Sequence, residues 1–164
     1  MRKFGVVFLL FLSAPALWAD NCRDTLPPEA GVERFVALDG GLLRDETTGL
    51  VWKRCLEGQT GNDCSGEVSK VRWSDAKIAA EAHSFAGYSD WRLPDLEDLR
   101  SIFEKKCDES SPVAGVFPND ENLGAWSAES SAYDDDYAWY VQFQSGNSST
   151  YVKSSSLPYR LVRQ

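Results

Sequence analysis

The densest cluster of side chains that could do chemistry is a run of three carboxylates between two tyrosines. It consists of Tyr133, Asp134, Asp135, Asp136 and Tyr137. Carboxylate oxygens are the ligands that hard cations prefer, and tyrosine rings can stack on sugars. The spacing is not that of a calcium-binding helix–loop–helix. A solvated loop that keeps a sheet edge soluble explains the same residues, so a binding site and a bland loop both stay open.

A second oxygen-rich run follows Pro118 and consists of Asn119, Asp120, Glu121 and Asn122. Its composition favours a turn over a metal site, and we expect neither a bound metal nor a cofactor in this chain. Loops on a rigid scaffold commonly carry function. We therefore hypothesise that this run and residues 133–137 form one face that meets a partner.

A third cluster combines a large aromatic, an arginine and several acids. Asp90, Trp91 and Arg92 come directly before Pro94, and Asp95, Glu97 and Asp98 follow. We expect Arg92 to pair with one of these carboxylates inside the domain. We expect Trp91 to be buried with a partner for its indole N–H. The cluster is therefore interpreted as structural and not catalytic.

Nucleophilic catalysis has little support in the sequence. There is no Gly-x-Ser-x-Gly elbow, and the single histidine, His83, lacks a recognisable partner motif. We expect His83 to complement a helix dipole or to face solvent. Two carboxylates could hydrolyse a glycoside, but that observation has no selectivity among 25 acidic residues. We therefore predict that the protein is not an enzyme.

Four cysteines follow the first 19 residues: Cys22, Cys55, Cys64 and Cys107. An even number in an exported chain predicts two disulfides, for which three pairings are possible. Zinc is the alternative, but Cys55 and Cys64 are too far apart for a zinc knuckle. We favour Cys55–Cys64, which closes a polar loop, and Cys22–Cys107, which ties the N-terminal leader to a long connection.

The first 19 residues resemble a secretory signal. Arg2 and Lys3 precede an apolar run over residues 4–12, and small residues lead to a cleavage site after Ala19. That run is too short to span a bilayer, and no later run predicts a transmembrane span. We expect an extended leader over residues 20–33 and one domain over residues 34–164. The predicted location is the periplasm, the medium or the cell surface.

The charge balance excludes one class of partner. The chain has 17 Lys and Arg against 25 Asp and Glu, and losing Arg2 and Lys3 with the signal takes its net charge from −8 to −10. Such a molecule repels nucleic acid and anionic membranes. No nucleic-acid partner is expected.

Two helices are predicted. The first begins at Ser74 as its cap, runs to about His83, and has Trp73 packed onto Ile78. The second follows Pro94, with Asp95 as its cap. Its apolar face should consist of Leu96, Leu99, Ile102 and Phe103.

Short strands account for most of the remainder. They are expected over residues 34–38, 42–44, 50–53, 125–127, 138–144, 150–153 and 159–163. Residues 107–124 are expected to be irregular. The side chains expected to be structural are Trp52, Trp73, Trp91, Arg92, Pro94 and Trp139.

Four short motifs occur in an order that resembles a known family. They are Thr48-Gly49-Leu50-Val51-Trp52, Asp90-Trp91-Arg92-Leu93-Pro94, Trp126-Ser127 and Arg160-Leu161-Val162-Arg163, with Trp73-Ser74-Asp75-Ala76 between the first two. Together they resemble the Lcl C-terminal domain family over about residues 35–163. The resemblance implies a C-type-lectin-like α+β fold, with two helices packed on a twisted antiparallel β-sheet and stapled by disulfides. It also implies a bacterial envelope or secreted protein.

The implied role is adhesion or ligand binding, with an unknown protein or glycan as the partner. Two other functions stay open: a periplasmic enzyme or enzyme accessory, and an envelope structural protein without a discrete ligand. The Glu-Pro-Asn or Gln-Pro-Asp signature of calcium-dependent lectins is missing, so sugar recognition through calcium is not implied. No collagen-like repeat precedes the domain, which leaves the oligomeric state open.

Overall fold

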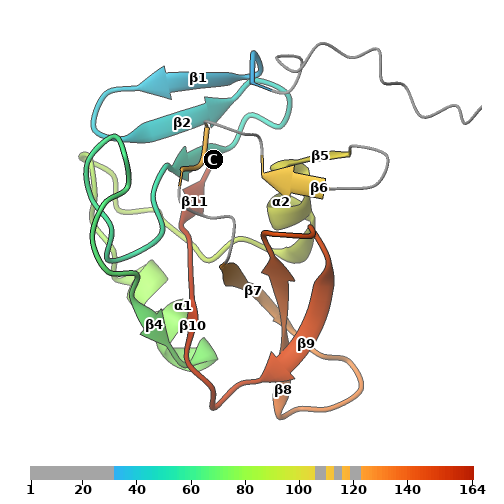
Figure 1. Cartoon of the computed structure of the whole chain (residues 1–164). Helices are drawn as coiled ribbons and strands as arrows, with labels where there is room; N and C mark the ends of the chain where they lie inside the picture. Colours follow the sequence, from blue (N-terminus) through green and yellow to red (C-terminus); the bar gives the residue numbers. More distant parts are fainter. Residues whose placement is uncertain (1–31, 106–109, 113–115, 119–122) are drawn as a thin grey trace, which may run out of the picture.

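The computed structural model describes residues 32–105, 110–112, 116–118 and 123–164 as a mixed α+β structure of antiparallel strands and two short helices (Figure 1). The helices are α1 (Trp73–Glu81) and α2 (Leu96–Ser101). The strands are β1 (Phe35–Leu38), β2 (Leu42–Asp45), β3 (Val51–Lys53), β4 (Lys70–Val71), β5 (Phe103–Lys105), β6 (Ser110–Pro112), β7 (Gly124–Ser130), β8 (Tyr137–Gln142), β9 (Ser148–Val152), β10 (Leu157–Pro158) and β11 (Val162–Arg163). In this part of the chain no helix is long and apolar enough to cross a membrane.

Two larger sheets organise the domain. One has the order β1-β2-β3-β11, so the last strand of the chain returns to pair with β3, Val162 opposite Trp52. The other is the meander β7-β8-β9, and two-stranded ribbons join β4 to β10 and β5 to β6. The return of β11 brings the two ends of the domain together in one sheet (Figure 1).

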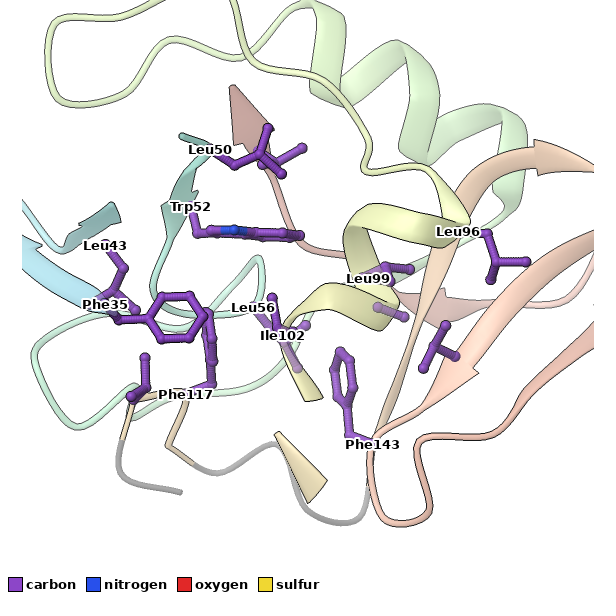
Figure 2. Packing of buried hydrophobic residues seen from close by; sticks show 14 residues of the cluster. Phe35, Leu43, Leu50, Trp52, Leu56, Leu96, Leu99, Ile102, Phe117 and Phe143 are labelled. Atoms are coloured by element: carbon purple, nitrogen blue, oxygen red, sulfur yellow. The ribbon is translucent and has the colours of Figure 1, made fainter. Parts of the chain in front are cut away.

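The core has two clusters, and the first surrounds Trp52. In Figure 2 the Trp52 indole lies between Phe35 and Phe117 on one side and Leu99, Ile102 and Phe143 on the other. Phe117 meets both Phe35 and Trp52 edge-on, with ring centroids 5.4 and 6.2 Å away. Such pairs add to the burial energy of large aromatic rings. β3 and α2 therefore share one apolar interior.

The second cluster contains Trp91 and Trp126, both buried, with Leu93 and Leu161. Each indole N–H donates to a backbone carbonyl, Trp91 to Phe85 at 3.4 Å and Trp126 to Val71 at 3.0 Å. A buried donor without a partner would cost free energy, so these bonds are part of what positions the rings.

Residues 90–94 form the corner that joins α2 to β11. The backbones of Arg92 and Val162 exchange two hydrogen bonds, of 2.9 and 3.1 Å. Arg92 Nη1 lies 2.6 Å from Asp98 Oδ2, which is the predicted internal ion pair. Asp95 caps α2 through a reciprocal capping box with Asp98, as predicted. At the corner's outer side, the hydrogen bond from Arg163 lowers the pKa of Asp90.

The start of α1 differs from the prediction. Arg72 is the N-cap and makes no side-chain capping bond, so the predicted Ser74 cap is wrong. Ile78 is 65% exposed and cannot staple to Trp73. The Trp73 indole instead donates to the Ser127 carbonyl at 2.8 Å, with the Lys77 and Lys153 ammonium groups over its ring. The need to pair the indole N–H with β7 outweighed the local apolar contact.

Three boundaries also moved. α2 ends at Ser101, and Phe103 belongs to strand β5 instead of the helix. β5 pairs with β6, which lies inside the stretch predicted to be irregular. The predicted last strand is divided into β10 and β11. Trp139 is partly buried against the first cluster.

Replacing Trp91 by alanine should prevent stable folding. Removing a buried Trp costs about 3–5 kcal/mol, a large share of the ~5–15 kcal/mol that holds a domain together. The Arg92→Ala change should cost less, about 1–3 kcal/mol, because the Arg92 side chain is 39% exposed. Urea unfolding of the two variants measures both costs.

Arg100→Ala is the matched control, since Arg100 forms an exposed i,i+3 pair with Glu97 on the same helix. Its free energy of unfolding should stay within about 0.5 kcal/mol of the parent's. A Trp91→Ala protein with the parent's stability would contradict the structural role of this corner.

Of the two predicted disulfides, Cys55–Cys64 is present. Cys22 and Cys107 lie outside the described residues, so their bridge stays a prediction. Peptide mapping without reduction should recover a Cys22–Cys107 peptide, because that bridge would tie the leader to the long connection. A peptide that links Cys22 to Cys55 or to Cys64 would refute the pairing.

Candidate functional site

The predicted tyrosine and aspartate run lies in the loop between β7 and β8. Tyr133 is 96% exposed, and the next three aspartates are exposed as well, whereas Tyr137 begins β8 and is half-buried. Asp134 Oδ1 accepts from the Asp136 amide at 2.9 Å, and Lys153 donates to the Asp135 carbonyl at 2.6 Å. The loop is thus a turn fastened to β9, with its carboxylates toward solvent.

The partner half of that predicted face cannot be placed beside it. Asn119, Asp120, Glu121 and Asn122 lie outside the described residues, so a joint face with the β7–β8 loop stays a prediction. Across the ranges that the structure describes, no three His, Cys, Asp or Glu side chains are grouped so that they could hold a metal ion.

A hollow of about 360 Å³ lies elsewhere, beside the loop that the disulfide closes. We call it the disulfide-loop pocket. It is lined by the β1–β2 turn (Gly40, Gly41), the end of β3 (Lys53), the disulfide loop (Cys55, Gln59, Thr60, Gly61, Asn62) and the segment after α1 (Phe85). In Figure 1 the β1–β2 turn and the loop after β3 are on the left, and the β7–β8 loop is at the lower right.

The disulfide loop has a shape that its sequence enforces. Thr60 and Ser65 exchange backbone hydrogen bonds of 2.9 and 3.0 Å inside the Cys55–Cys64 ring. Gly58 has φ +91°, and a Cβ there would lie 2.4 Å from the Glu67 carbonyl oxygen. Only glycine fits such a position without strain. The wall of the pocket is therefore held in one conformation.

A buried ion pair forms the charged part of the pocket. Lys53 Nζ lies 2.5 Å from Glu57 Oε1, and both side chains are about nine-tenths buried. The same ammonium lies 4.7 Å from the centroid of the Phe85 ring. His83 Nε2 lies 4.0 Å from Glu57 Oε1. Because Lys53 and Glu57 neutralise each other, the pocket offers a ligand no net charge.

Tyr159 belongs to the same neighbourhood. Burial, and then the negative charge of Glu57, raise the pKa of its phenol. Both effects disfavour the phenolate. Tyr159 therefore keeps its proton at neutral pH and does not act as a base.

Two buried polar atoms near this ion pair lack hydrogen-bond partners among the described residues. They are Gln59 Oε1 and His83 Nε2. Gln59 is only 6% exposed and lines the pocket, whereas His83 is not a lining residue. Buried polar groups in native proteins are nearly always paired. The pocket therefore has an unmet capacity for a hydrogen bond.

Sequence reasoning recognised this loop only as one that needed a disulfide. The available signal was the run of glycines and uncharged polar side chains between Cys55 and Cys64. Nothing in the sequence showed that Phe85 and the β1–β2 turn would join it, because these contacts cross more than 20 residues of chain.

Fold and pocket together define a small, disulfide-linked α+β domain that presents a ligand-sized hollow on its loops. The chain belongs to the Lcl C-terminal domain family, whose model matches residues 41–163. That range includes every pocket residue except Gly40. No curated protein matches the sequence significantly.

Removing the disulfide should weaken both the domain and the pocket. Chain-entropy bookkeeping gives about 2.5–3 kcal/mol for so short a loop. A protein with both Cys55→Ala and Cys64→Ala should therefore unfold at lower urea than its parent. This double variant is better than a reductant, because a reductant would also attack the predicted Cys22–Cys107 bridge. An unchanged urea midpoint would show that the loop does not need its covalent closure.

Proposed function

We propose that this chain is an exported binding domain on a C-type-lectin-like scaffold, and that it recognises an envelope protein or glycan through the disulfide-loop pocket. The observation that carries this proposal is the pocket itself, a hollow of about 360 Å³ walled by an aromatic ring and uncharged polar side chains. Its volume is at the small end of ligand-binding pockets, which span ~300–1,000 Å³.

The chemistry of the pocket supports binding more than catalysis. A general acid or base needs a proton to give or take near neutral pH. Lys53 and Glu57 neutralise each other, and Tyr159 is held in its neutral form. The remaining polar groups in the lining are amides and a hydroxyl, which hydrogen-bond a ligand without exchanging protons with it.

Two further features support the scaffold and the location. The closing strand β11 pairs with β3, so the ends of the domain meet, as the lectin-like likeness implies. The Cys55–Cys64 disulfide suits an oxidising compartment outside the cytoplasm. Both agree with export by the predicted signal over residues 1–19.

The β7–β8 loop is the second candidate for the contact surface. Its favouring observation is the almost fully exposed Tyr133 ring beside three exposed aspartates. A ring exposed to that degree has area to give to a partner. The two surfaces lie apart in Figure 1, so variants can test them separately.

The test is a screen of residues 20–164 against glycans and envelope extracts, followed by two matched variants. The pocket variant combines Thr60→Ala with Asn62→Ala, both at exposed positions. It should weaken binding about tenfold, because two hydrogen bonds of about 0.5–1.5 kcal/mol each are lost. Its unfolding free energy should change by no more than about 0.5 kcal/mol.

The control variant combines Tyr133→Ala with Asn at positions 134, 135 and 136. It should fold equally well and keep the parent's affinity. The opposite pattern, with affinity lost only in the control, would move the contact surface to the β7–β8 loop. Turnover of a ligand by the parent protein would contradict the binding-only function.

A further inference from the structure

We propose that the ligand group held in the disulfide-loop pocket is an uncharged sugar ring. This inference rests on the proposed function and narrows its ligand to one chemical class. Three properties of the pocket lead to it: its charge balance, its hydrogen-bonding groups and its apolar wall.

The charge balance disfavours ionic ligands. Lys53 is the only charged residue in the lining, and Glu57 at 2.5 Å already neutralises it. An anion would have to compete with Glu57 for the ammonium, and the chain's formal net charge of −8 would oppose its approach. A cation would meet the same ammonium at close range. A neutral ligand avoids both costs.

The hydrogen-bonding groups match hydroxyls. Gln59 and Asn62 each supply an amide with two donors and one acceptor oxygen, and Thr60 supplies a hydroxyl. A sugar hydroxyl also donates and accepts, so it can meet either end of such an amide. Gln59 Oε1 is the acceptor without a partner among the described residues. Rotation of the amide about its last torsion turns this oxygen toward a hydroxyl in the pocket.

The apolar wall matches the C–H surface of a ring. Phe85 lines the pocket as a half-buried aromatic, supported edge-on by Trp91 at 6.2 Å between centroids. Cys55 and the two glycines of the β1–β2 turn add surface without polar side chains. Gly41 has open space where a Cβ would be, so the backbone itself is the wall there. A volume of about 360 Å³ suits one or two rings and not a long chain.

The direct test is ligand-observed NMR of residues 20–164 with a panel of neutral hexoses and N-acetylhexosamines. The matched competitors are the corresponding uronic acid, a sulfated hexose, an unacetylated hexosamine and a neutral tetrapeptide. At least one neutral sugar should bind ten times more tightly than each charged counterpart and than the tetrapeptide. Equal or tighter binding of a charged sugar or of the peptide would overturn the proposal.

The residue-level test is Gln59→Met, which keeps the length of the side chain and removes its amide. Binding of the neutral sugar should fall at least tenfold, whereas the melting temperature should stay the same or rise, because a buried unpaired acceptor is gone. A structural Gln59 predicts the reverse, with a lowered melting temperature and unchanged binding. That result would overturn the proposal.

Failure here can be told from failure of the proposed function. An extract component whose binding depends on Thr60 and Asn62, and which no neutral sugar displaces, would overturn the sugar class and leave the binding pocket intact. Binding that is indifferent to Thr60, Asn62 and Gln59 would overturn both.

Discussion

The fully buried guanidinium of Arg160 is the interaction on which the pocket depends. It donates to the carbonyl oxygen of Lys53 at 3.0 Å and also to that of Arg54, at the point where β3 leaves its sheet. Phe117 lies under the same group, with the ring centroid 4.5 Å from the guanidinium carbon. Carbonyl partners and an aromatic face together repay the desolvation of a buried cation better than either would alone. Arg160 thereby fixes the direction in which the chain enters the disulfide loop.

From that point the core and the pocket divide the work. Leu56 points into the first hydrophobic cluster, while Gln59 and Thr60 a few residues later line the hollow. The disulfide and the glycine conformations then hold the loop without needing apolar side chains of its own. This arrangement allows polar groups to line a fixed wall, and it explains how an incompletely paired amide can persist at Gln59. The stability for it comes from the two tryptophan-centred clusters.

The sequence predicted those elements whose signals are local. Asp95 after Pro94 predicted the start of α2, and the polar run between Cys55 and Cys64 predicted their bridge, because each depends on residues within one turn or loop. Trp73 was misjudged, since its indole found a partner 54 residues away on β7 instead of a neighbour on its own helix. The pocket was missed for the same reason. Its walls come from three separate stretches, and only folding shows that Gly40, Gln59 and Phe85 face one hollow.

Hydrogen–deuterium exchange with and without a bound ligand is the most direct test of the claim that the disulfide-loop pocket is the binding site. It needs no substitution, and it compares the pocket and the β7–β8 loop in one experiment. We expect slower exchange in peptides that cover residues 53–62 and 83–88, with no change over residues 130–137. Slower exchange confined to residues 130–137 would contradict this account.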